Sequence, residues 1–161
     1  MIKIQFETGT FLEINATTLM GYDFSRMNLH RAILDSLCLD FSLFREAHLR
    51  NISIENSSVK NADFYNAALM NAFLKNSDMT GCDFQNSRPI AANFSHSVLI
   101  NSNFAGADIS RADFSGANLC GANLCFERYD EVTLAGALFD ENTRWPDKFD
   151  PVKEGAILCT T

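Results

Sequence analysis

Residues 92–124 read ANFSHSVLINSNFAGADISRADFSGANLCGANL, and this stretch decides the fold. A small residue, then usually Asp or Asn, then Leu or Phe, recurs in it every five residues. A period of five matches neither the 3.6-residue period of a helix nor the two-residue period of an ordinary strand. The chain must therefore turn once in every repeat.

The same period runs through most of the chain. Counting in fives from Leu19 to Phe139 gives 25 central positions, of which only Pro89 and Tyr129 are not plainly apolar. Two residues before the centre, at positions 32 to 122, 17 of 19 residues are Ala, Ser or Cys. A small residue that regularly precedes a large one predicts that both point inward, with the small residue at a tight corner.

The position two residues after each centre predicts the turn. Of the 25 residues there, 14 are Gly or Asn, including six of the chain's eight glycines. Gly and Asn share a tolerance of positive φ, which a type II turn requires at its third residue. We therefore expect each repeat to be a short extended piece followed by a type II turn.

The spacing of phenylalanines predicts how many repeats make one coil. Twenty residues separate successive members of two central series: Phe24, Phe44, Phe64, Phe84 and Phe104, and Phe94 and Phe114. Like side chains stack well when neighbouring coils lie one strand spacing apart. We therefore expect a coil of four repeats with a phenylalanine ladder inside it. About six such coils, at roughly 4.8 Å each, give a rod on the order of 30 Å long.

Several repeats match the motif A(D/N)LXX closely, with Phe or Ile in place of Leu in some of them. They begin at Ala62-Asp63-Phe64, Ala107-Asp108-Ile109, Ala112-Asp113-Phe114 and Ala117-Asn118-Leu119. In this respect the chain resembles the pentapeptide-repeat family over roughly residues 17–141. The resemblance implies an all-β fold, a right-handed quadrilateral β-helix or solenoid with four pentapeptides in each 20-residue coil. The right hand of the helix is implied by the resemblance alone.

The ends of the chain read as caps. We expect an N-terminal cap at residues 1–16, the repeat domain at residues 17–141 and a C-terminal capping tail at residues 142–161. Apolar and polar residues alternate on both sides of Thr8-Gly9, which predicts a small hairpin or a first partial coil. In the tail, we expect Trp145 and Phe149 to cover the apolar opening of the last coil, because an uncovered coil presents unpaired strand edges.

Three irregularities interrupt the repeat. Pro89 has no N–H to donate, so we expect a lost inter-coil hydrogen bond and a bulge there. Glu127 cannot occupy an inward corner cheaply, so the chain should swing outward near it. At four corners a larger residue replaces the small one, which predicts wider corners there: Tyr22, Met27, Leu37 and Ile52.

Composition excludes several classes of protein. The 161 residues carry a net charge of −7, which argues against direct nucleic-acid binding. The sequence has no run of eighteen apolar residues, so we expect no membrane span, and the first residues do not read as a signal peptide. The five cysteines form no CxxC pair, so we expect reduced thiols and a cytoplasmic location.

The sequence contains no signal for catalysis, a cofactor or a metal. His30, His48 and His96 should point outward without a ligand partner, and no GxxxxGK, GxSxG or HExxH motif occurs. Asp63 and Asp83 should stack one coil apart, but on shallow surface without the pocket that paired catalytic carboxylates need. We therefore expect no enzyme, and no catalytic, cofactor-binding or metal-binding residues.

A rigid scaffold for protein–protein interaction is the function that these features favour. The register places Met70, Phe73 and Ile90 outward and close together, and an exposed apolar cluster on a regular surface indicates a contact with a protein partner. The sequence does not identify that partner. Self-association into a homodimer through an end cap is a further expectation.

A DNA mimic that binds a type II topoisomerase is the alternative. Some pentapeptide-repeat proteins are acidic rods that bind such enzymes in place of DNA and protect against quinolones, and the resemblance extends to them. However, residues 16–126 hold ten acidic and eight basic residues, so the rod itself is nearly neutral. A mimic of a phosphate backbone should carry its acids along the rod.

Overall fold

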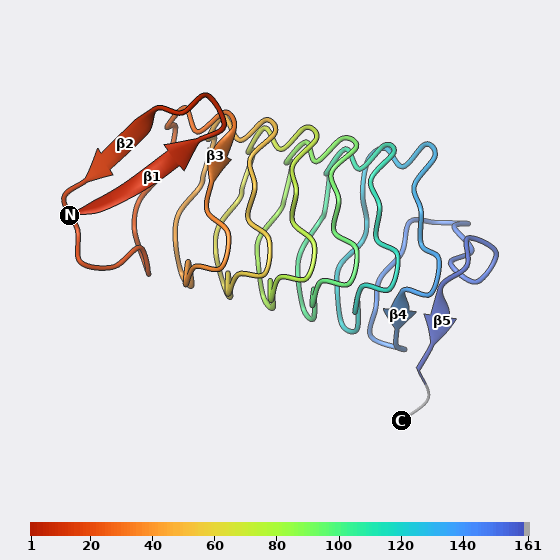
Figure 1. The fold of residues 1–161 in the computed structure, drawn as a ribbon. Helices are drawn as coiled ribbons and strands as arrows, with labels where there is room; N and C mark the ends of the chain where they lie inside the picture. Colours follow the sequence, from red (N-terminus) through yellow and green to blue (C-terminus); the bar gives the residue numbers. More distant parts are fainter. Residues whose placement is uncertain (160–161) are drawn as a thin grey trace.

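The computed structural model describes residues 1–159, so the last two residues of the expected tail, Thr160 and Thr161, lie outside it. Coils stack along one axis between an N-terminal hairpin and a C-terminal segment (Figure 1). The described residues form short strands and no helix, as expected of an all-β chain, and none could span a membrane as a helix. The strands are β1 (Ile2–Phe6), β2 (Phe11–Ile14), β3 (Ala32–Ile33), β4 (Leu138–Phe139) and β5 (Ile157–Leu158).

The hairpin predicted at the N-terminus is present and closes the first coil. Strand β1 pairs with β2 antiparallel, with Ile2 opposite Ile14, and also pairs antiparallel with β3 in the first full coil. Gly9 reverses the chain between β1 and β2 at a φ of +82°. Ile4 and Ile14 are buried because alternate residues of each strand face the core.

Parallel bridges between residues twenty apart confirm the predicted length of the coil. Asp63 bridges Asp83, which bridges Asn103, and three further columns of bridges repeat the same separation. Between two coils, the Phe64 N–H donates to the Asp83 carbonyl at 2.7 Å, and the Asp83 N–H donates to the Ala62 carbonyl at 3.0 Å. Each coil therefore serves as the edge on which the next one forms.

The turn geometry is more regular than the sequence that encodes it. Every position two after a centre, from Gly21 to Gly121, has a φ between +54° and +71°. This confirms the positive φ that the Gly and Asn residues predict. The same conformation also occurs at residues that disfavour it, among them Arg26, Phe41 and Glu46. Inter-coil pairing therefore imposes the turn where the local residue does not prefer it.

One column of turns differs from the others in its hydrogen bonding. Most corners close with a bond such as Met27 N–H to Phe24 O, at 3.1 Å. At Ser57, however, the N–H donates to the Ser77 hydroxyl at 3.1 Å, and that hydroxyl donates to the Ile54 carbonyl at 2.7 Å. A buried ladder of serines thus links these turns from one coil to the next.

The phenylalanine ladder is confirmed. The rings of Phe44 and Phe84 lie on either side of the Phe64 ring, each with a centroid separation of 4.8 Å, and the planes are nearly parallel. A second stack, Phe94 over Phe114, touches the first edge-on at 5.6 Å. These rings are fully buried, so the ladder is the centre of the core.

The enlarged corner residues take three different positions. Ile52 is fully buried, so that corner accepts a larger side chain. Leu37 is 37% exposed and turns outward. Tyr22 and Met27 are half-buried and pack against the first coils.

The bulge expected at Pro89 is absent. The Ala92 N–H donates to the Pro89 carbonyl at 3.0 Å, and Ala91 has the usual φ of +56°. Proline keeps the corner because its missing N–H removes one inter-coil bond without blocking the turn. The excursion predicted at Glu127 does occur: this side chain is exposed, whereas Leu134 returns to the core.

Aromatic side chains pack together at the C-terminal end. Trp145 stacks on Phe149 at a centroid distance of 5.2 Å, and both rings meet Phe126 edge-on. Trp145 also contacts Phe139 edge-on at 5.6 Å, and β5 pairs in parallel with β4 beside them. These rings lie against the last coil's core.

Candidate interaction surface

The structure brings together two of the three residues that the sequence predicts to contact a partner. Met70 and Ile90 occupy equivalent positions on adjoining coils, where the Asn71 N–H donates to the Ile90 carbonyl at 2.9 Å. Both side chains are half-buried on the outer surface. Phe73 is 43% exposed but lies beyond the next corner, where it bridges Ser53. The predicted cluster is therefore a stacked pair with an aromatic ring on the adjoining side.

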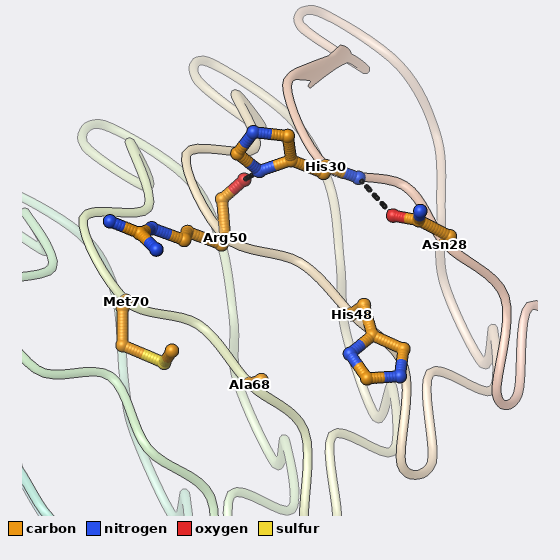
Figure 2. Close-up of a pocket in the computed structure, with 6 residues that line it drawn as sticks. All are labelled: Asn28, His30, His48, Arg50, Ala68 and Met70. Carbon is orange, nitrogen blue, oxygen red and sulfur yellow. Dashed lines mark hydrogen bonds between the residues drawn. The ribbon is translucent and has the colours of Figure 1, made fainter.

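A groove of about 400 Å³ lies on the same side as Met70 (Figure 2). Its lining residues are Asn28, His30, His48, Arg50, Ala68 and Met70. They form two columns, one before and one after the buried centres Leu29, Leu49 and Leu69. Because each centre points inward, its two neighbours must point outward. Three consecutive coils therefore build the groove from residues that are spread over positions 28–70 of the sequence.

Two hydrogen bonds hold His30 at one end of the groove. Its Nδ1 lies 2.8 Å from the Arg50 carbonyl oxygen, which can only accept, so Nδ1 carries the proton. Its main-chain N–H donates to the Asn28 side-chain oxygen at 3.2 Å (Figure 2). His48 lies on the opposite side of the groove from His30 and Arg50.

We call the outward positions at residues 28–31, 48–51, 68–71 and 88–91 the basic side. These positions hold Arg31, Arg50, Arg88 and both groove histidines, and within the described chain they contain no Asp or Glu. The sequence alone shows basic and acidic residues interspersed along the rod. Because each coil takes twenty residues, the coiling places these basic residues on one side and the acidic residues on others. An acidic protein thus carries one locally positive surface.

The arginines of the basic side differ in their partners. Arg31 lies 3.7 Å from a carboxylate oxygen of Glu7 in the hairpin. Arg50 and Arg88 form no ion pair with any of residues 1–159, although Arg88 shares a depression with Asp108 and Glu127. Arg50 is therefore the exposed cation of the groove whose charge no ion pair balances.

Beyond Ile90 the same side of the rod becomes mixed in charge. A second concavity of about 550 Å³ is lined by Ile90, Asp108, Ser110, Arg111, Arg128, Asp130 and Glu131. Here Arg128 lies 3.5 Å from Asp108 and 3.6 Å from Asp130. Arg128 therefore has acidic partners in this concavity, in contrast to Arg50 in the groove.

The stacked carboxylates take part in the local structure of the repeat. Asp63 and Asp83 are bridged one coil apart, as expected, and each accepts a 2.9 Å bond from the N–H two residues ahead. Asp63 also accepts a bond from the Arg45 guanidinium. Both groups therefore have a structural role in their own turns. Among residues 1–159, no three His, Cys, Asp or Glu side chains gather in a metal-binding arrangement.

The five cysteines are free thiols in different surroundings. Cys38 is exposed, whereas Cys82 is buried at an inward corner, where burial raises the pKa of its thiol far above the usual value. Burial also raises the pKa of Cys120, to which the nearby Asp140 charge contributes.

Sequence reasoning missed the groove, although a signal for it was present. His30 and His48 were expected only to point outward, each without a ligand partner, and they line one depression. Both columns that line the groove follow from adding twenty to each residue number. The positive charge of these columns comes from their exposed side chains, which are not part of the repeat motif.

Comparison with known proteins identifies the repeat. The family described as "Pentapeptide repeats" matches residues 47–86 and 90–124, in eight copies. Among curated protein sequences, none matches the chain.

Several solved pentapeptide-repeat structures are similar to this chain. Rfr23 from the cyanobacterium Cyanothece 51142 is 19% identical, with a TM-score of 0.58 over 78% of this chain and 89% of that one. The protein alr5209 from Nostoc Pcc 7120 is 32% identical over 60% of this chain and 84% of its own, with a TM-score of 0.44. QnrB1, a plasmid-mediated fluoroquinolone resistance protein, is 16% identical over 91% and 86%, with a TM-score of 0.45. The repeat, its coiled structure and the family match together place this chain in the pentapeptide-repeat family.

Proposed function

We propose that this protein is a non-enzymatic scaffold, a right-handed quadrilateral β-helix of about six coils, that docks a protein partner on the side bearing Met70 and Ile90. One observation carries the proposal. The fold needs apolar residues at the inward centres and small residues at the corners, and it places no such demand on outward positions. Met70, Phe73 and Ile90 are nonetheless apolar and outward. Such an exposed apolar group supports a contact surface.

Affinity capture from native lysate with quantitative mass spectrometry tests this proposal. The Met70→Ser/Phe73→Ser variant should lose a protein that the unmodified chain captures, because the anchors of the contact are gone. Met20→Ser/Phe41→Ser is the control, since it replaces one Met and one Phe that are exposed elsewhere on the rod. Capture that survives the first double variant, or that falls equally in both, would show that this surface is not the contact.

The second candidate function is that of a DNA mimic, a protein that binds a type II topoisomerase in place of its DNA substrate. The net charge of −7 and the stacked Asp63 and Asp83 favour it. Its weakness is Arg45, which pairs with Asp63 and neutralises part of that column. A supercoiling assay with purified gyrase decides between the two, since a mimic should inhibit gyrase or protect it from a quinolone at micromolar protein. Unaltered supercoiling and unaltered quinolone sensitivity would exclude it.

Homodimerisation through an end cap accompanies the scaffold proposal. Ile157 and Leu158 of β5 are half exposed, and Phe11 of β2 is 57% exposed. Exposed apolar residues on short terminal strands favour pairing with a second chain. Size-exclusion chromatography with light scattering should give a dimer mass, and a monomer at every concentration would exclude self-association.

A further inference from the structure

We infer that the groove around Arg50 binds an acidic peptide segment of the protein partner. A carboxylate of the peptide would lie against Arg50 between His30 and His48, and an apolar side chain would pack on Met70 and Ile90. This inference rests on the proposed scaffold function and names the chemistry of its partner.

The first step is the unbalanced charge in the groove. Arg50 is exposed, and no carboxylate of residues 1–159 lies within ion-pair distance of it. By contrast, Arg26, Arg45 and Lys60 on other sides each have an acidic partner. An arginine presents a planar fork of N–H donors that matches a carboxylate. His48, across the groove from Arg50, adds a ring N–H donor, whereas the His30 Nδ1 proton is already donated to the Arg50 carbonyl.

The second step is the apolar surface beside that charge. Ala68 and Met70 line the groove next to Arg50, and Ile90 continues the apolar strip on the following coil. A bare inorganic anion would leave this strip uncovered. A peptide covers it, because an apolar side chain can pack there while a neighbouring carboxylate reaches Arg50.

The third step separates a peptide from a nucleic acid. Bound single strands usually stack their bases on large aromatic rings, and among the described residues the basic side has no Phe, Tyr or Trp, only the imidazoles of His30 and His48. The adjoining sides carry acids, including Asp35 and Glu55 on one and Asp63 on the other. These charges and the net charge of −7 repel a long polyanion but leave room for a short acidic segment.

The spacing of the coils defines the peptide. Arg50, Met70 and Ile90 follow one another along the rod axis, with coils about 4.8 Å apart. An extended chain advances about 3.3 Å per residue. The matching segment therefore has an apolar residue one to three positions after the carboxylate. Arg88 contributes less, because Asp108 and Glu127 share its depression.

A titration of the ¹⁵N-labelled full chain at low salt, followed by NMR, tests the inference. The probe is acetyl-Gly-Glu-Glu-Leu-Val-Gly-amide, and the same peptide with Gln in place of Glu is its control. We expect saturable shifts centred on the amides of Arg50, Met70 and Ile90, and a loss of affinity of about tenfold for the Gln peptide. Added salt should weaken the binding.

Variants identify the residue that carries the recognition. Arg50→Gln should weaken peptide binding about fivefold to tenfold. Lys75→Gln removes the same charge from the adjoining side, where Lys75 pairs with Glu55, and should change it less than twofold. Circular dichroism checks that each variant is folded. An absence of shifts at millimolar peptide, shifts elsewhere, or full binding by Arg50→Gln would overturn the inference.

Three further outcomes separate the alternatives. Tighter binding of the oligonucleotide dT6 than of the peptide, lost in Arg50→Gln, would assign the groove to nucleic acid and overturn the inference. If the peptide does not bind but Met70→Ser/Phe73→Ser still abolishes capture, the inference of an acidic segment is overturned and the scaffold proposal stands. Peptide binding with capture unaffected by Met70→Ser/Phe73→Ser would instead overturn the scaffold's contact surface.

Discussion

Replacing Phe64 with Ala should remove the middle of the phenylalanine ladder. The Phe64 ring is fully buried and stacks on Phe44 and Phe84, both at 4.8 Å. The neighbouring rings cannot close the gap, because hydrogen bonds between the coils fix the spacing of the backbone. Core Phe→Ala substitutions cost about 3–5 kcal/mol in free energy of unfolding, and the loss of two stacked neighbours places this one near 5 kcal/mol.

Urea unfolding followed by far-UV circular dichroism measures this cost, with Trp145 fluorescence as a second probe of whether unfolding is two-state. Phe41→Ala is the matched control, because the Phe41 ring is 57% exposed. Its cost should stay within about 0.5 kcal/mol. A loss below about 1 kcal/mol for Phe64→Ala, or an equal loss in both variants, would mean that the register of the core is wrong.

Three smaller predictions follow from single residues. Phe41→Asn should raise the free energy of unfolding by about 1 kcal/mol in urea, because Phe41 has a φ of +62° that Asn tolerates better; a loss of stability would contradict this. Ser77→Ala should lower it by about 1–3 kcal/mol in the same assay, since the Ile54 carbonyl loses a buried hydroxyl donor; an unchanged midpoint would refute the serine ladder. Mass spectrometry after iodoacetamide treatment of the native protein should find Cys38 alkylated and Cys82 intact, because burial raises the pKa of Cys82 and the thiolate is the reactive form; equal labelling would show that the corner is open.

The period of the chain and the direction of its side chains could be predicted because each repeat contains its own turn. Five residues hold a central apolar side chain such as Leu99, a small corner residue such as Ser97 and a turn residue such as Asn101. The stacking of coils is also visible in the sequence, since Phe64 and Phe84 differ by twenty. These features are local or strictly periodic, so no tertiary information is needed to find them.

The sequence less readily predicts where the fold overrides local preference. Phe41 adopts a positive φ because hydrogen bonds from both neighbouring coils fix its turn. Pro89 fits its corner without a bulge for a related reason, since the bonds on either side of it hold the turn. At Phe41 the inter-coil ladder outweighs a preference of about 1–2 kcal/mol against the left-handed conformation.

By itself, then, the sequence determined the five-residue turn, the twenty-residue coil and the buried ladder, because these depend on spacing along the chain. Only the tertiary structure decided which outward side chains share a surface. His30, Arg50 and Met70 are twenty residues apart and carry no common motif, yet winding places them in one groove of an acidic protein. The physical reason is that the repeat constrains the inward positions through packing, whereas outward positions become neighbours only after the coils have stacked.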